Sequence, residues 1–146
     1  MKRVNILLAA LWLLTVPALA QGDRISKNPD DLPRQSREFL DKHFAGLAIS
    51  HIKIEKNLIG VDSYDVILTD GSKIEFDKAG AWEEIKRPAS PIPASLLPAF
   101  VKKYVAEHYA GIQVLAIEKD AKEYEVKLQN GIELKFDLQG NLTDID

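Results

Sequence analysis

One stretch of this 146-residue chain occurs twice. Residues 64–85 read YDVILTDGSKIEFDKAGAWEEI, and residues 124–145 read YEVKLQNGIELKFDLQGNLTDI. The two stretches align without a gap, and the matched pairs include Tyr64 and Tyr124, Val66 and Val126, Phe76 and Phe136, and Gly80 and Gly140. A repeat at a fixed spacing indicates two copies of one structural unit. The chain is therefore predicted to be a tandem duplication.

Each copy begins with a helical pattern, in which apolar residues recur every three or four positions. The first helix is expected from Leu32 to Gly46, and the second over residues 96–109. Pro33 and Pro98 fit the first turn of a helix, where a missing N–H group costs nothing. Equivalent residues of the two helices, such as His43 and His108, are farther apart in the sequence than equivalent residues of the strands. The first copy therefore carries extra residues between its helix and its second strand, around positions 57–61.

Four strands are expected after each helix. In the second copy they are residues 114–119, 123–129, 132–137 and 141–145. Asn130-Gly131, and Asp70-Gly71 in the first copy, are typical of tight hairpin turns, because both turn residues need positive φ. Charged and apolar residues alternate along these strands, which predicts one buried and one wet face.

These patterns predict an α+β fold, built from a tandem α-β-β-β-β unit. One unit is too small to be stable alone, so the two should form one antiparallel sheet with both helices on one face. The expected segments are a signal peptide (1–20), a flexible lead-in (21–31), a first repeat (32–87), a proline-rich linker (88–93) and a second repeat (94–146).

The first segment gives the expected location. Lys2 and Arg3 precede a short apolar run that ends in Ala18-Leu19-Ala20, which is typical of a cleaved secretory signal. The protein is therefore predicted to be periplasmic or secreted, with no membrane insertion after cleavage. The chain has no cysteine, which excludes disulfides and thiolate metal sites. Its net charge of −3 offers no basic surface for nucleic acid.

No catalytic residue, cofactor or metal site is predicted. His43 and His108 lie near the ends of the two helices and are interpreted as helix-terminal residues, and His51 stands alone in a strand. Asp77 and Asp137 each precede a turn glycine by three residues, and we expect their carboxylates to cap the turn. A calcium loop would need acidic or amide residues at alternating positions, and these turns do not provide them.

The extra residues of the first copy point to a binding surface. They place Leu58 and Ile59 at the tip of a longer first hairpin, where a partner can contact them. Trp82 replaces the Leu142 of the second copy, and its role as core residue or exposed anchor stays open. The charges on the wet face alternate in sign, which favours a solvated face with cross-strand pairs and leaves a binding surface as the alternative.

The motifs "HFAG" and "HYAG" at the helix ends, followed by YDVILTDGSKIEFDKAG and YEVKLQNGIELKFDLQG, give the chain a family resemblance. Over residues 32–146 it resembles the putative beta-lactamase-inhibitor-like, PepSY-like secreted proteins. The resemblance implies helices packed on an antiparallel sheet and, for PepSY domains, restraint of peptidases. The inhibitor domains carry disulfides that this chain lacks, so no inhibitory residue is carried over.

The predicted function is a non-catalytic, periplasmic or secreted protein-binding module. We expect its partner to be another envelope protein, and we expect the chain to resemble an inhibitor of an envelope enzyme such as a peptidase. Three alternatives stay open: a small ligand or lipid held between the helices and the sheet, a homodimer through an exposed strand edge, and an envelope hydrolase.

Overall fold

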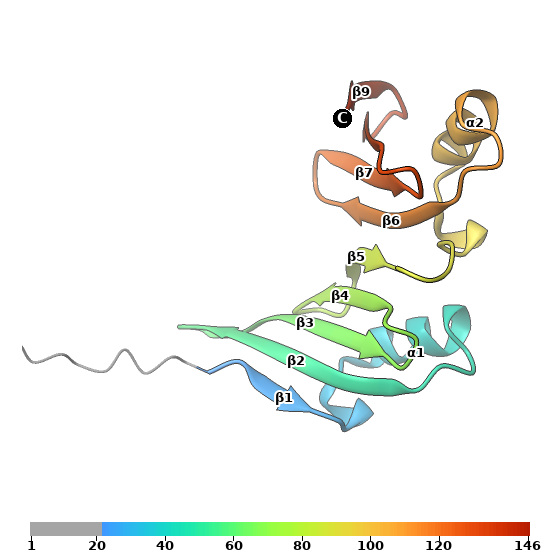
Figure 1. Cartoon of the computed structure of the whole chain (residues 1–146). Coiled ribbons are helices and arrows are strands. Elements are labelled where there is room, and N and C mark those ends of the chain that lie inside the picture. Colours follow the sequence, from blue (N-terminus) through green and yellow to red (C-terminus); the bar gives the residue numbers. More distant parts are fainter. Residues whose placement is uncertain (1–21) are drawn as a thin grey trace, which may run out of the picture.

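The computed structural model describes residues 22–146 and shows, within them, an α+β fold with a nine-stranded antiparallel sheet (Figure 1). The predicted signal peptide lies outside the described residues. The strands are β1 (Arg24–Ser26), β2 (Ile49–Asn57), β3 (Gly60–Leu68), β4 (Lys73–Asp77), β5 (Trp82–Lys86), β6 (Val114–Lys119), β7 (Glu123–Leu128), β8 (Glu133–Asp137) and β9 (Leu142–Ile145). The strand order in the sheet is the order along the chain.

Two helices, α1 (Arg34–His43) and α2 (Ala99–His108), lie on one face of the sheet, as predicted (Figure 1). Each helix begins directly after a proline. Pro33 and Pro98 have extended backbones, with ψ values of 146° and 148°, so they precede the first turn instead of lying in it. The proline ring restricts φ to a range that suits the residue at the entry to a helix as well as the first helical position.

The core lies between the helices and the sheet. Alternate strand residues point into it, and ten of them are at most 1% exposed: Ile52, Val66, Ile74, Phe76, Ile85, Ile117, Val126, Leu128, Leu134 and Phe136. Leu40 of α1 and Val101 of α2 complete the core from the helix side. The residues between these strand positions carry the charges, which confirms the predicted division into a buried and a wet face.

The order of elements is a helix and four strands, given twice: α1 with β2–β5, then α2 with β6–β9. The two sets join where β5 pairs with β6, in the three residue pairs Glu84–Glu118, Ile85–Ile117 and Lys86–Ala116. The two isoleucines at this seam are fully buried. The duplication itself and the repeat and linker boundaries stay predictions.

Arg87 ties the seam to the first half. Its guanidinium donates hydrogen bonds to Ser72 Oγ at 3.1 Å, Asp70 Oδ2 at 3.1 Å and the Pro91 carbonyl oxygen at 3.0 Å. The guanidinium carbon also lies 5.5 Å from the centre of the Phe44 ring. One side chain therefore joins the β3–β4 turn, the linker and the end of α1.

The lead-in differs from the expected flexible segment. Arg24–Ser26 forms β1, which pairs with β2 opposite Ile52–Ile54 and makes the sheet one strand wider than the predicted eight. A short 3₁₀ helix, η1 (Pro29–Asp31), follows, and Asp31 binds both Arg24 and Ser26. The polar sequence of β1 carries no strand signal. The segment forms a strand because the free edge of β2 supplies partners for its backbone hydrogen bonds.

Asp77 and Asp137 cap their turns, as predicted. Asp77 Oδ1 accepts hydrogen bonds from the backbone N–H groups of residues 79, 80 and 81 at 2.8–3.0 Å. Asp137 does the same at Gln139 and Asn141, at 3.0 and 2.8 Å. Hydrogen bonds from the side chain and backbone of Asn141 hold the pKa of Asp137 below its ordinary value.

The glycine of each capped turn packs against the start of a helix. Gly140 has a φ of +90°, and a Cβ atom there would lie 2.7 Å from Phe100 Cγ of α2. Gly131 has the same φ of +90°, but a Cβ atom there would meet nothing within 4 Å. The two positions differ in packing and not in backbone conformation.

We expect Gly131→Ala to lower the free energy of unfolding by about 1–2 kcal/mol, because an alanine is strained at positive φ. Gly140→Ala should lower it by a further ~1–3 kcal/mol, because its Cβ overpacks Phe100. Urea unfolding followed by Trp82 fluorescence measures both. Equal losses for the two variants would show that the Phe100 ring moves aside freely.

Candidate functional site

The β2–β3 hairpin projects beyond the rest of the sheet (Figure 1). β1 accompanies β2 only as far as Ile54, and β4 accompanies β3 only from Ser63 onward. The end of the hairpin, residues 56–62, therefore lies beyond both neighbouring strands. This agrees with the prediction that the extra residues lengthen the first hairpin.

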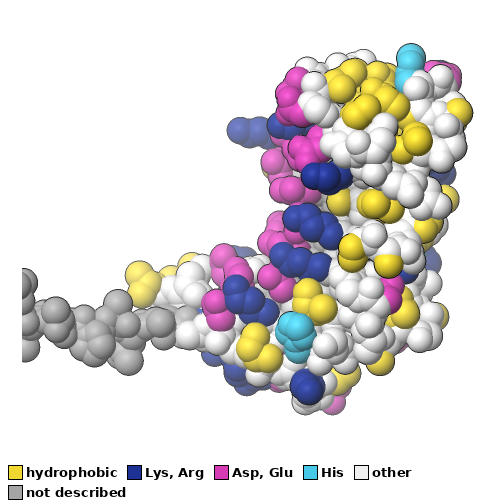
Figure 2. Space-filling model, viewed as in Figure 1, with side chains coloured by type: hydrophobic (Ala, Val, Ile, Leu, Met, Phe, Trp, Pro, Cys, Tyr) yellow, Lys and Arg dark blue, Asp and Glu magenta, His cyan; other side chains and the backbone are white. Residues whose placement is uncertain are grey.

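Leu58 and Ile59 form the tip of this hairpin, and each is 90% exposed. Figure 2 shows hydrophobic side chains at this end of the molecule. Asn57 fixes the turn, since its Oδ1 accepts from the Ile59 N–H at 2.9 Å and its Nδ2 donates to Asp62 Oδ1 at 3.0 Å. The tip is thus an apolar surface on a hydrogen-bonded turn.

The structure places Trp82 away from the tip, at the start of β5. Its ring is partly buried on the helix side, with its centre 6.3 Å from that of Phe39 in α1. Lys119 Nζ lies 4.1 Å from the centre of the Trp82 ring, a cation–π contact that joins the two halves. The position matches the core alternative, and contact of Trp82 with a partner stays a prediction.

The face opposite the helices is hollowed, and acidic and basic side chains gather along it (Figure 2). The strand register places five carboxylates directly opposite one another on five successive strands. This acidic row consists of Asp65, Glu75, Glu84, Glu118 and Glu125. The alternation of sign expected from the sequence holds along single strands but fails across the middle of the sheet.

Lysines lie beside the acidic row. Lys73 Nζ is 3.3 Å from Asp65, 3.4 Å from Glu75 and 3.6 Å from Glu84, and Lys86 Nζ is 2.5 Å from Glu84. In the second half, cross-strand pairs of the predicted kind join Lys127 with Glu133 and Lys135 with Glu125. Opposite charges therefore neutralise part of the row.

Burial and the remaining repulsion both shift pKa values within the row. Burial and the neighbouring carboxylates raise the pKa of Glu75 and that of Glu118 above the ordinary glutamate value. Burial alone would lower the pKa of Lys73, but the carboxylates around it outweigh that effect and raise the pKa. The face is thus an acidic surface that favours an approaching cation.

The three histidines are dispersed. His43 and His108 are the last residues of α1 and α2, as predicted, and their rings stack on Phe39 at 4.7 Å and Tyr104 at 4.3 Å. Burial lowers the pKa of His43. His51 Nδ1 contacts Ser50 Oγ at 3.2 Å. Within residues 22–146, no three histidine, cysteine or acidic side chains are grouped to hold a metal ion.

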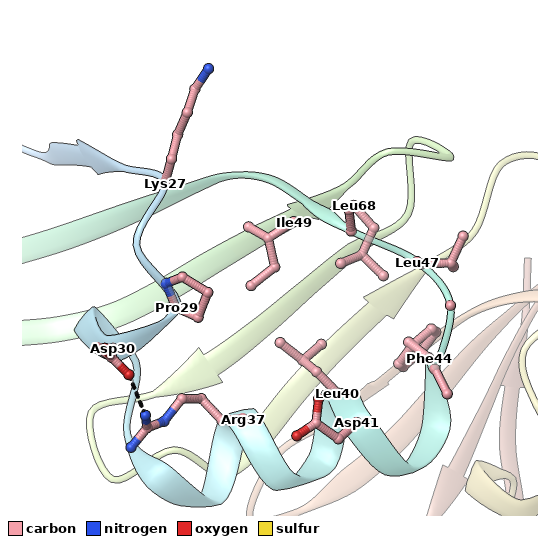
Figure 3. Close-up of a pocket in the computed structure, with 13 residues that line it drawn as sticks. Lys27, Pro29, Asp30, Arg37, Leu40, Asp41, Phe44, Leu47, Ile49 and Leu68 are labelled. Carbon is pink, nitrogen blue, oxygen red and sulfur yellow. Dashed lines mark hydrogen bonds and ion pairs between the residues drawn. The ribbon is translucent and has the colours of Figure 1, made fainter.

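A groove that we define as the α1–β2 groove opens between α1 and the start of β2, with a volume of about 530 Å³ (Figure 3). Its apolar lining is Leu40, Phe44, Leu47, Ile49 and Leu68, and its polar lining includes Lys27, Asp30, Arg37 and Asp41. Arg37 Nη1 binds Asp30 Oδ1 at 2.6 Å at one end. No residue of this groove stood out as a site residue in the sequence, because the apolar ones follow the ordinary helix and strand periodicities.

A family model described as putative beta-lactamase-inhibitor-like, PepSY-like matches residues 62–144 of the chain. A putative periplasmic protein from Bacteroides vulgatus is 42% identical, with 87% of this chain and 98% of that chain covered and a TM-score of 0.80. A putative calcium-regulated periplasmic protein from Bacteroides thetaiotaomicron is also 42% identical, with the same coverage and a TM-score of 0.81. No curated protein matches the chain.

A second Bacteroides vulgatus structure, of a putative periplasmic protein of unknown function, is 37% identical, covers 86% of this chain and 99% of that chain, and has a TM-score of 0.81. These relatives confirm the predicted periplasmic or secreted location. In the part of the chain that the structure describes, neither helix has the length and apolar character needed to cross a membrane.

Glu84→Gln tests the acidic row. Because the charge of Glu84 raises the pKa of both Glu75 and Glu118, the variant should lower both values, as measured by NMR titration of the side-chain carboxyls. A raised pKa stabilises the fold below the ordinary value of 4.5, and this contribution is lost as the pH rises through the folded-state pKa. The Glu84→Gln variant should therefore lose less free energy of unfolding than the unchanged chain as the pH rises through these pKa values.

Glu83→Gln is the matched control, because Glu83 lies at the bulge in β5 and has no partner in the acidic row. It should leave both titrations unchanged. If the two variants shift Glu75 and Glu118 equally, the row does not act as a coupled set.

Proposed function

The chain belongs to the family described as putative beta-lactamase-inhibitor-like and PepSY-like, and on that premise we propose that it is a non-catalytic periplasmic protein-binding module. It acts in the manner of an inhibitor, by occupying the surface of an envelope enzyme such as a peptidase. The family description and the periplasmic location of the relatives support this assignment.

The apolar hairpin tip is the observation that carries the proposal. Leu58 and Ile59 are each 90% exposed on a hairpin that extends beyond its neighbouring strands. Burying one such side chain in a partner contributes about 1.5–3 kcal/mol. The hydrogen bonds of Asn57 hold the turn in place before binding, which reduces the entropy lost on association.

The acidic row supports the same proposal. It begins at Asp65 of β3, the strand that also forms the hairpin, and continues across the hollowed face. A partner that fits both features presents an apolar cleft beside lysine or arginine side chains. Opposite charges of this kind accelerate association and select the partner.

Calcium is not part of the proposal. The Bacteroides thetaiotaomicron relative is described as a putative calcium-regulated protein. We extend no calcium site to this chain, since residues 22–146 contain no group of three or more candidate ligands arranged around one point.

The double variant Leu58→Asp and Ile59→Asp tests the tip. The chain without its predicted signal peptide is immobilised, and proteins retained from an envelope extract of its own host are quantified by mass spectrometry. The variant should retain the partner at least about tenfold less, because each charged side chain opposes burial in an apolar cleft.

Leu138→Asp is the control, because Leu138 is also exposed, at 47%, but lies in the β8–β9 turn. It should retain the partner as the unchanged chain does, and circular dichroism should show all variants folded. Equal retention by the tip variant would remove the tip from the binding surface. A retained peptidase whose activity falls on binding would support the inhibitor role.

A further inference from the structure

The molecule contains the same groove twice. A second groove of about 270 Å³, the α2–β6 groove, lies between α2 and the start of β6. Its lining repeats that of the α1–β2 groove position by position, in the register that aligns the two helices: Val105 for Leu40, Tyr109 for Phe44, Ala110 for Ala45, Ile112 for Leu47 and Val114 for Ile49. The two grooves are equivalent places in the two halves.

The chain itself occupies the α2–β6 groove. Ile92, in the linker before α2, is only 4% exposed and belongs to the hydrophobic core. Its backbone N–H donates to the carbonyl oxygen of Val114, the first residue of β6, at 2.8 Å. One aliphatic side chain and one backbone hydrogen bond of the linker therefore fill part of this groove.

The α1–β2 groove has no such occupant among the described residues. The residue at the position equivalent to Ile92 is Lys27, which is exposed and directs its amino group away from the groove (Figure 3). Only Lys27 and Asn28 connect β1 to η1, whereas residues 87–93 connect β5 to the 3₁₀ helix η2 (Ala94–Leu96). The shorter connection leaves the groove larger and open.

One polar feature of the α1–β2 groove remains free. β1 covers β2 only at Ile52–Ile54, and no segment in the described part of the chain donates a hydrogen bond at Ile49 as Ile92 does at Val114. An occupant therefore needs a donor for this strand edge.

We propose that the α1–β2 groove binds an extended peptide segment of a partner protein. One aliphatic side chain of the peptide takes the place that Ile92 takes in the other half, and the backbone N–H of that residue donates to the carbonyl oxygen of Ile49. This mode adds a short strand to an exposed sheet edge, and the site is separate from the hairpin tip.

A peptide fits the groove better than a lipid does. The strand edge requires a backbone donor, which a hydrocarbon chain lacks. Lys27 and Arg37 stand beside Asp30 and Asp41 at the rim, so the rim has no single sign of charge to attract an anionic head group. The occupant of the equivalent groove is also an extended peptide segment, part of this chain.

The linker provides the probe. A capped synthetic peptide with the sequence of residues 87–96, RPASPIPASL, is titrated into the ¹⁵N-labelled chain that lacks its predicted signal peptide. Saturable amide shifts are expected at residues 40–49, and the Ile92→Asp version of the peptide should bind at least about tenfold more weakly. Shifts that map to the hairpin tip or the hollowed face would overturn the proposal.

Matched protein variants test the place of binding. Ala45 and Ala110 are exposed and line the two grooves at equivalent positions. Ala45→Trp should weaken peptide binding at least about tenfold, because the indole fills the open groove, and Ala110→Trp should leave it unchanged. The Leu58→Asp, Ile59→Asp variant should also bind the peptide normally, so failure of this site and failure of the hairpin tip are distinguishable.

Three further kinds of result would overturn the inference. The first is a lack of specific binding, seen either as equal affinity of the Ala45→Trp variant or as no saturation up to about 1 mM peptide. The second is saturation of the same amides by decanoate without any by the peptide, which would make the groove a lipid site. The third is a concentration dependence of these shifts without peptide, which would make it a contact between copies of the chain.

Discussion

The pairing of β5 with β6 is the constraint on which the rest of the molecule depends. Each helix covers the strands of its own half, and three residue pairs at this seam make one sheet out of two. Ile85 and Ile117 bury the seam, and Arg87 holds it to the first half by bonds that reach Asp70 and the linker. Glu84 and Glu118 face each other on its other side, so the same pairing that closes the core also creates the middle of the acidic row.

The possible contact surfaces are distributed around this common sheet. The tip of the first hairpin is apolar, the hollowed face is charged, and the α1–β2 groove lies on the helix side. All three belong wholly or partly to the first half, whose hairpin is longer and whose connection before the helix is shorter. The second half uses the equivalent groove for its own Ile92. The differences between the halves, rather than their likeness, therefore distinguish the surfaces available to partners.

The sequence predicted those elements whose signals are local. The turn at Asn130-Gly131 and the caps at Asp77 and Asp137 depend on a few adjacent residues, and the structure confirms their positions. The expected positive φ is found at Gly131 but not at Asn130. β1 was missed because this segment forms a strand only by pairing with the edge of β2. The acidic row was missed because it depends on the register of five strands, and bulges shift that register in β5 and β6. Arg87 was missed for a similar reason, since its partners are brought together only by the fold.

The order of the strands in the sheet has a consequence for how the protein reaches its folded state. Every strand after β1 pairs only with the strands before and after it in the chain, so no strand pairing waits for a distant segment of the sequence. The widest gaps between paired strands are the connections from β1 to β2 and from β5 to β6, which each contain one 3₁₀ helix and one α-helix. Proteins with such local contacts fold faster than sheets of similar size with crossed connections. A chain that folds without disulfides to guide it thus exposes its strand edges only briefly.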